Sequence, residues 1–317
     1  MQEQLIKRAK ELLAEGKVQK VVGWKKGLFD EDITPAVFTT AEELDKDFVF
    51  NKYCAANLSK YLVKITKDIE IKKSTTRMNN TMAKQRDPNA AEAPIPSEVV
   101  LVFLKPNDTY SFTQLLKENR ITRSDVYAIG VPCQDTLEGG EPCVNCQNKK
   151  PVSCDELIGV EAEAPAVEST RMEMVEKLEA MTAEERYDFW QNEFSRCIRC
   201  NACRNICPAC TCEKCVFDNN ALYTSQKVAE TSFEESLFHI VRAWHVAGRC
   251  TDCGECSRVC PQGIPLHLLN RKFIKDINEI YGPYQAGADM ETKPAMLTFK
   301  EEDPETSIIS DRQEEEV

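Results

Sequence analysis

The sequence lacks any apolar run long enough to cross a membrane. A transmembrane helix needs about 20 consecutive apolar residues, whereas the continuous apolar stretches here, such as residues 99–104, are far shorter. The amino terminus is a charged amphipathic segment without the apolar region of a secretory signal. These absences predict a cytoplasmic protein with no membrane span.

Positive charge is also scarce. The chain has 40 Lys and Arg against 52 Asp and Glu, which gives a formal net charge of −12. Because binding to a nucleic acid requires a basic face, nucleic acid is not expected as a partner. No G-x-G-x-x-G motif occurs, so the sequence gives no support for a Rossmann-type nucleotide site.

Cysteine, in contrast, is abundant. The chain has 16 cysteines, and in a reducing compartment metal binding is a better explanation for so many than disulfides. Two runs in the second half share the spacing C-x2-C-x2-C-x3-C-P. They are Cys197, Cys200, Cys203 and Cys207 before Pro208, and Cys250, Cys253, Cys256 and Cys260 before Pro261.

This spacing is typical of paired 4Fe-4S clusters, in which the fourth cysteine of each run binds the cluster of the other run. Three closely spaced thiolates wrap one loop around three corners of a cube, and the fourth leaves on the next turn. Structural zinc is the alternative, because C-x2-C pairs also suit a tetrahedral metal. The predicted ligand sets are Cys197, Cys200, Cys203 and Cys260 for cluster 1, and Cys250, Cys253, Cys256 and Cys207 for cluster 2.

Eight further cysteines are enough for two more clusters. Four lie within 22 residues in a loop that contains Gly and Pro, namely Cys133, Cys143, Cys146 and Cys154. They are candidate ligands of a third cluster, with zinc or free thiols as alternatives. Cys210, Cys212 and Cys215 follow the first run directly. They are candidate ligands of a fourth cluster completed by Cys54 or Cys154, or else spare thiols beside the dicluster. Cys54 is preferred, because Cys154 lies close in the chain to the other candidate ligands of the third cluster.

The pattern of residues 1–160 predicts an α/β domain with a mostly parallel sheet. Apolar residues at helical spacing indicate helices at residues 2–15 and 54–67, and alternating or continuous apolar runs indicate strands at 18–24, 98–104 and 125–131. Strands that alternate with helices are typical of such a sheet. Residues 72–96 are rich in Thr, Asn and Lys and are expected to form a mobile insertion.

The second half is expected to be α-rich. Residues 161–195 are interpreted as a helical linker, 196–284 as a ferredoxin-like 4Fe-4S domain, and 285–317 as an acidic, disordered tail. Thr182 and Glu185 form a predicted capping box. A helix is predicted at residues 233–247 with Leu237, Ile240 and Trp244 facing inward, whereas His239 and His245 are not expected to be ligands.

Two sets of motifs carry a family resemblance. Residues 130–134 (Gly-Val-Pro-Cys-Gln), with Cys143 and Cys146, and the segment Asn51-Lys52-Tyr53-Cys54 resemble the beta subunit of deazaflavin-coenzyme-reducing hydrogenase and its formate dehydrogenase relatives. Residues 248–256 and 260–265 resemble ferredoxin-type modules of heterodisulfide reductase complexes. The resemblance covers about residues 1–284.

The resemblance implies a 4Fe-4S cluster beside a flavin, FAD, in the first domain. Two features depart from the family pattern: residues 105–108 read Lys-Pro-Asn-Asp where Lys-Gly-Cys-Asp is expected, and the ferredoxin module follows the first domain.

Two functions follow as hypotheses. The first is an electron-transfer subunit that relays electrons through several 4Fe-4S clusters between a second carrier and a hydrogenase, formate dehydrogenase or heterodisulfide-reductase-like partner. The alternative is a flavin-containing oxidoreductase that reduces a deazaflavin in its amino-terminal domain. Disulfide reduction is disfavoured, because catalytic relatives use an adjacent Cys-Cys pair and this chain has none.

Overall fold

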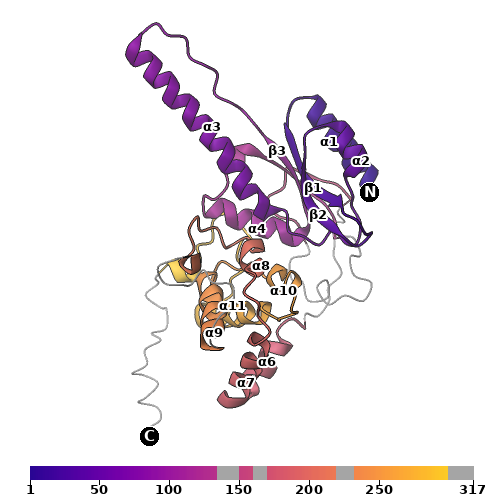
Figure 1. Cartoon of the computed structure of the whole chain (residues 1–317), viewed down its shortest axis with the longest axis vertical. Helices are drawn as coiled ribbons and strands as arrows, with labels where there is room; N and C mark the ends of the chain where they lie inside the picture. Colours follow the sequence, from indigo (N-terminus) through magenta and orange to yellow (C-terminus); the bar gives the residue numbers. More distant parts are fainter. Residues whose placement is uncertain (134–149, 160–169, 219–231, 299–317) are drawn as a thin grey trace.

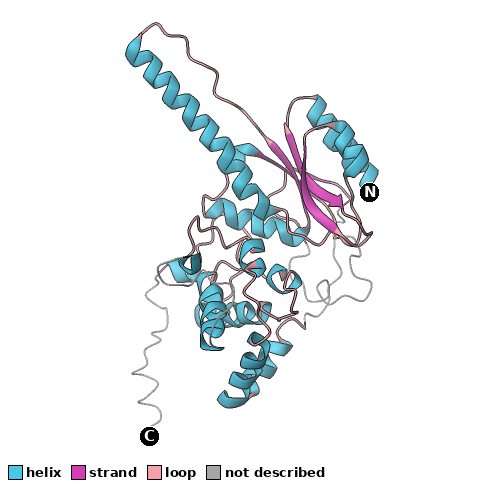
Figure 2. Cartoon of the chain, in the orientation of Figure 1, coloured by secondary structure: helices cyan, strands magenta, loops and turns pink. Residues whose placement is uncertain are grey.

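The computed structural model describes residues 1–133, 150–159, 170–218 and 232–298. Figure 1 shows the amino-terminal half as a sheet flanked by helices, and the carboxyl-terminal half as a group of helices packed below it. Figure 2 shows that the strands drawn are confined to the first half. Cys143 and Cys146 lie outside the described residues.

The sheet has the strand order β2-β1-β3-β4-β5. Its strands are β1 (Lys20–Lys26), β2 (Ile33–Phe38), β3 (Val100–Leu104), β4 (Val126–Gly130) and β5 (Glu156–Leu157). Only the β1–β2 pair is antiparallel among the described pairs, and β1–β3, β3–β4 and β4–β5 are parallel. The prediction of a mostly parallel sheet is therefore confirmed. Every residue of β3 is buried, as expected for a central strand covered on both faces.

Four helices accompany the sheet: α1 (Gln2–Ala14), α2 (Ala41–Asp47), α3 (Ser59–Arg86) and α4 (Pro106–Lys117). Helix α1 buries Leu5, Ala9 and Leu12, which are the apolar positions that predicted it. Thr40 and Glu43 form a capping box at the start of α2. Helix α4 follows β3 after one residue, and its proline stands at the first helical turn, where a missing N–H has no cost.

The prediction of a mobile insertion at residues 72–96 is wrong for residues 72–86, which are helical. Helix α3 continues to Arg86 and projects beyond the sheet (Figure 1). The hydroxyls of Thr75, Thr76 and Thr81 donate to the carbonyl oxygens four residues earlier, at 2.8–3.0 Å. These bonds satisfy the hydroxyls within the helix, although bonds of this kind do not themselves stabilise it.

The described part of the second half contains helices and no strands after β5. The helices are α6 (Glu173–Ala180), α7 (Ala183–Phe194), α8 (Ala202–Ile206), η2 (Val216–Asp218), α9 (Ser232–His245), α10 (Glu255–Arg258), α11 (His267–Tyr281) and η4 (Ala295–Leu297). The predicted capping box of Thr182 and Glu185 is present at the start of α7. Helix α6 packs Val175 and Leu178 against Leu268 of α11.

Helix α9 is oriented opposite to the prediction. Leu237, Ile240 and Trp244 are 44%, 49% and 60% exposed, and Phe233 on the same face is 69% exposed. The buried face instead carries the ionisable residues Glu235, His239 and Arg242, together with Phe238. The sequence prediction failed because it placed the apolar stripe in the core, although the surroundings of this helix are rich in cysteine.

The two halves pack through polar contacts beside the second cysteine run. The Asn57 amide N–H donates to Glu255 at 3.3 Å, and Ser111 lies 2.8 Å from the hydroxyl of Thr251. The predicted tail also begins too early, since Ala286 is buried and Gly287 packs against the backbone of Tyr110. Within the described ranges, no helix combines the length and apolarity that a bilayer crossing requires.

The core of the first half depends on Phe103, which is fully buried in β3 and lies 5.3 Å from the ring of Phe48. We expect Phe103→Ala to lower the free energy of unfolding by about 3–5 kcal/mol, because it leaves a cavity. Denaturant unfolding followed by circular dichroism measures the change. Phe29→Ala, at a position 71% exposed, is the matched control and is expected to change stability little. An equal effect of both variants would contradict this view of the core.

Candidate metal centre

The two cysteine runs adopt matching backbone conformations. In the first, Arg199 and Asn201 have φ values of 49° and 61°; in the second, Asp252 and Gly254 have 57° and 72°. These are equivalent positions, the second and fourth residues after the first cysteine of each run. Left-handed residues turn successive backbone amides toward the concave side of a loop, which suits an anionic group. The Arg199 amide already donates to Cys197 Sγ at 3.4 Å.

Buried ion pairs hold both loops. The Arg199 guanidinium lies 3.2 Å from the Glu235 carboxylate, and Asp252 accepts from Arg171 at 3.1 Å and Arg271 at 2.9 Å. A left-handed conformation costs energy for a residue such as Arg. The ion pair of Arg199 therefore stabilises a loop shape that its backbone disfavours.

One cavity brings together the four cysteines predicted for cluster 1. Three come from the first run and one from the end of the second, so the crossing pattern expected from the spacing is present in the fold. Phe238, His239, Ile264 and Leu266 close the cavity with mostly apolar surface. Its cysteines are Cys197, Cys200, Cys203 and Cys260.

A second cavity is lined by Cys207, Cys250 and Cys253, together with Pro208 and Ala209. Cys207 again comes from the first run and the other two from the second. Cys256, the remaining residue of this predicted set, does not line the cavity but is buried in the core cluster that contains Cys203. The Asn270 side-chain amide donates to Cys256 Sγ at 3.6 Å.

Burial controls the chemistry of these thiols. It raises the pKa of Cys197 and of Cys256 to about 12 and raises that of Cys253 well above its usual value. In the metal-free chain these sulfurs therefore keep their protons at neutral pH. Binding of a metal requires the thiolate, so the metal must displace these protons.

Two buried side chains in this region have polar atoms without a hydrogen-bond partner in the described structure. They are both ring nitrogens of His239 and all three guanidinium nitrogens of Arg242. Burial of an unpaired cation is costly, so an anionic group beside Arg242 is expected. The sulfur ligand sets, the left-handed loops and this unpaired cation all fit anionic 4Fe-4S clusters.

A third group of cysteines lines a separate pocket of about 420 Å³. Cys210, Cys212 and Cys215 share it with Arg204, Arg242 and Arg249, among others. Helix α3 holds this segment, because Lys60 donates to the Cys210 carbonyl and Lys67 pairs with Glu213.

Cys54, the predicted fourth ligand of this group, does not line the pocket. Its thiol is buried in the core of the first half and donates to the Val49 carbonyl at 3.6 Å.

Cys133 and Cys154 lie near the end of β4. Cys133 is exposed, and Cys154 donates to the Val152 carbonyl at 3.5 Å. Gly130 allows this approach, since a Cβ at that position would lie 3.0 Å from Cys154 Sγ. Cys143 and Cys146 fall outside the described residues, so this ligand set stays a prediction.

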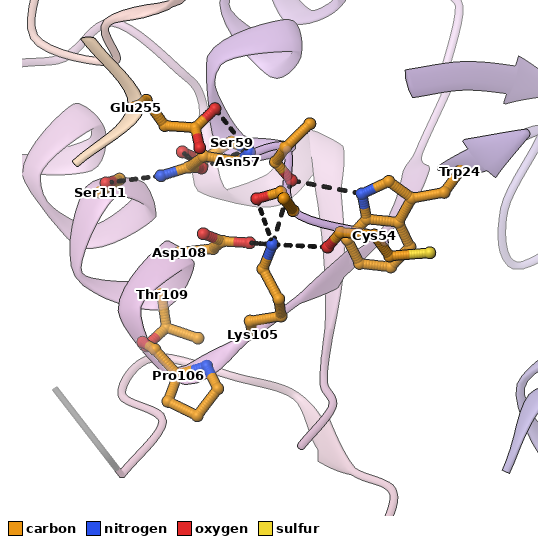
Figure 3. Close-up of polar contacts among 12 residues, drawn as sticks. Trp24, Cys54, Asn57, Ser59, Lys105, Pro106, Asp108, Thr109, Ser111 and Glu255 are labelled. Carbon is orange, nitrogen blue, oxygen red and sulfur yellow. Dashed lines mark hydrogen bonds and ion pairs between the residues drawn. The ribbon is translucent and has the colours of Figure 1, made fainter. Parts of the chain in front are cut away.

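Lys105, at the loop that departs from the family pattern, fixes the segment around Cys54. Its ammonium group donates to the carbonyl oxygens of Cys54, Ala55 and Ala56 at 2.8, 2.6 and 3.3 Å (Figure 3). Asp108 lies 3.5 Å from the same ammonium group. This arrangement explains why Cys54 is held within the first half.

Asp108 is buried, and one of its carboxylate oxygens has no hydrogen-bond partner in the described structure. Burial raises the pKa of Asp108 to about 7, although Lys105 opposes the shift. Glu255, of the second cysteine run, adds to the rise. A carboxyl group at the junction of the two halves therefore changes its charge near neutral pH.

These features define an iron–sulfur protein, in which an α/β domain is followed by a region whose cysteine runs fold together. Residues 193–264 match the 4Fe-4S dicluster domain family. The chain therefore carries 4Fe-4S clusters, as its cysteine spacing predicted.

Two curated relatives are beta subunits of formate dehydrogenases. The F420-dependent formate dehydrogenase subunit beta of Methanocaldococcus jannaschii is 28% identical over 131 residues, which cover 40% of this chain and 34% of the relative. The F420-dependent formate dehydrogenase 1 subunit beta of Methanococcus maripaludis is 32% identical over 133 residues, covering 41% and 33%. The predicted resemblance is confirmed, but this chain spans only about a third of the length of either relative.

The sequence prediction missed the polar residues of α9. Potential ligand atoms of Cys197, Glu235 and His239 lie within 4.8 Å of one another, whereas His239 had been expected only as core or surface. Glu235, His239 and Arg242 stand at positions i, i+4 and i+7 of one helical face. This spacing is the signal in the sequence that could have indicated a buried polar face. It becomes informative only once the cysteine runs are known to pack against the helix.

We expect Asp108 to make stability depend on pH. Because its pKa is raised, its contribution is fully present below about pH 4 and is lost as the pH rises through about 7, with a slope of up to about 1.4 kcal/mol per pH unit. Asp108→Asn is expected to flatten the fall in melting temperature between about pH 4 and 7. The exposed control Asp87→Asn should retain the wild-type slope. An unchanged slope in Asp108→Asn is the contrary result.

Proposed function

We propose that this chain is an electron-transfer subunit of a larger redox complex. The observation that carries the proposal is the cavity in which Cys260 of the second run joins Cys197, Cys200 and Cys203 of the first. Such crossing of cysteines between runs is the arrangement of two-cluster ferredoxins. The match of residues 193–264 to the 4Fe-4S dicluster domain family supports it.

Two ligand sets follow within this proposal. They are Cys197, Cys200, Cys203 and Cys260 for cluster 1, and Cys250, Cys253, Cys256 and Cys207 for cluster 2. When bound, the clusters supply one-electron transfer. The protein residues hold the metal, keep water away and supply hydrogen-bond donors to sulfur.

Particular residues fit these roles. Phe238, Ile264 and Leu266 shield the first cavity from solvent, since each is 1% exposed. The Asn270 amide at 3.6 Å from Cys256 Sγ is a donor of the kind that tunes a cluster. The backbone amide of Arg199 has the same relation to Cys197.

Two further metal sites are part of the proposal. Cys133, Cys143, Cys146 and Cys154 would form one, at the carboxyl end of β4, where α/β sheets place their functional groups. Cys210, Cys212 and Cys215 would form the other in the adjoining pocket. We leave Cys54 out of this set, because it does not line the pocket and Lys105 binds the carbonyl of Cys54 within the first half.

We propose a formate-dehydrogenase-like catalytic subunit as the partner, with hydrogenase or heterodisulfide-reductase-like assemblies as alternatives. The two relatives, both beta subunits of F420-dependent formate dehydrogenases, support this choice. The exposed apolar face of α9, formed by Phe233, Leu237, Ile240 and Trp244, is the kind of surface that a subunit buries against a partner. The opposite face of the same helix lines the cysteine cavities.

Iron analysis of protein purified without oxygen tests the metal assignment. We expect more than about eight irons per chain, since two 4Fe-4S clusters account for about eight. Cys200→Ser should lower the iron and sulfide content by the equivalent of one cluster, and Cys212→Ser should lower it if the third group of cysteines binds metal. Cys54→Ser is the matched control and should retain the wild-type content. Zinc without iron would contradict the proposal.

The visible spectrum of the same samples distinguishes an electron-transfer subunit from the alternative, a flavin-containing oxidoreductase. An iron–sulfur spectrum that lacks flavin bands, with no FAD released on denaturation, is expected for an electron-transfer subunit. Flavin bands with stoichiometric release of FAD would instead favour a deazaflavin-reducing site in the first domain.

A further inference from the structure

Arg242 is a buried cation whose position the proposed function does not yet explain. Its side chain is 3% exposed on α9, and its Nε and both terminal nitrogens have no hydrogen-bond partner in the described structure. The other buried arginines of this region are ion-paired, such as Arg199 with Glu235 and Arg171 with Asp252. Arg242 therefore has five N–H donors and a full charge to satisfy.

The buried face of α9 extends from one cysteine cavity to the other. His239, three residues before Arg242, lines the cavity of Cys197, Cys200, Cys203 and Cys260. Val246, four residues after Arg242, packs with Cys207, Cys210 and Cys250. Residues three and four apart on a helix share a face, so Arg242 lies between the two cavities.

Arg242 also lines the adjoining pocket that contains Cys210, Cys212 and Cys215. Arg242 therefore lies on the helix face between the two cavities and also lines the adjoining pocket. An arginine guanidinium keeps its positive charge in proteins, so the buried Arg242 is a permanent cation.

We propose that Arg242 is the shared counter-ion and hydrogen-bond donor of the clusters in both cavities, and that it makes both of them easier to reduce. This inference rests on the proposed function. Reduction adds one electron, and hence one negative charge, to a cluster, whereas Arg242 keeps its proton and its positive charge. A fixed cation stabilises the more negative state more strongly, particularly in a buried site of low dielectric constant. A single residue would thus raise the potentials of both clusters together.

The guanidinium is suited to this position for two reasons. Its planar group presents donors in a fixed fork, so it can contact sulfur acceptors on two sides at once. A lysine at the same place would keep the charge but concentrate its donors at one point. Arg242→Lys and Arg242→Gln therefore separate the effect of the charge from that of the hydrogen bonds.

The test is a redox titration with dithionite, followed by EPR, on holoprotein purified without oxygen. In Arg242→Gln we expect both cluster signals to need a potential at least about 59 mV lower, which corresponds to a tenfold smaller ratio of reduced to oxidised cluster at fixed potential. Arg242→Lys should give a smaller shift in the same direction. Arg186→Gln is the matched control, because it removes the same charge from a residue that, within the described part of the chain, hydrogen-bonds to the carbonyls of residues 178, 179 and 181.

The outcomes separate this inference from the proposed function. Unchanged midpoints in Arg242→Gln with wild-type iron content overturn it, as does a shift of one cluster alone. Absence of iron from the wild-type protein would overturn the proposed function itself. If Arg242→Gln fails to assemble clusters, a second experiment on the wild-type protein tests the inference. The chain is labelled with guanidinium-¹⁵N arginine, and pulsed EPR should detect ¹⁵N coupled to both clusters. A missing coupling at either one contradicts the shared role.

Discussion

The structure depends on the gathering of cysteine thiols from two distant runs into neighbouring buried cavities. Burial raises the pKa of Cys197 and Cys256 to about 12, so these two thiols keep their protons until a metal displaces them. The same region contains an unpaired guanidinium, that of Arg242. Burial of this cation is costly in a metal-free chain and favourable beside anionic clusters. The surroundings are therefore built for a metal-bound state.

This constraint also explains the orientation of α9. Its ionisable residues face the cysteines, and its apolar residues face outward, the reverse of an ordinary surface helix. An anionic environment inside the protein attracts the cation, and the apolar stripe remains for contact with another molecule. The α/β half meets this region through Asn57, Ser111 and Asp108, beside the second cysteine run. The two halves thus contact each other beside the second cysteine run.

Sequence reasoning predicted the mostly parallel sheet because strands alternate with helices in the first half. It predicted the clusters because the spacing of the cysteines suits the corners of a cube. It failed where local pattern and environment disagree. Residues 72–86 lack an apolar face, yet they continue α3. Cys54 was assigned by elimination to the group of Cys210, Cys212 and Cys215. In the structure, Lys105 binds three carbonyls of the segment that contains Cys54 and holds that segment within the first half.

The sequence by itself determined the chemistry of the site, because C-x2-C-x2-C-x3-C-P specifies which sulfurs can reach one cluster through local turns. Only the tertiary structure decided which non-local groups surround those sulfurs. The carboxylate of Glu235 pairs with Arg199, and Arg242 lies between the two cavities. These relations arise from the packing of α9 against both loops, and no local pattern in the chain encodes that packing.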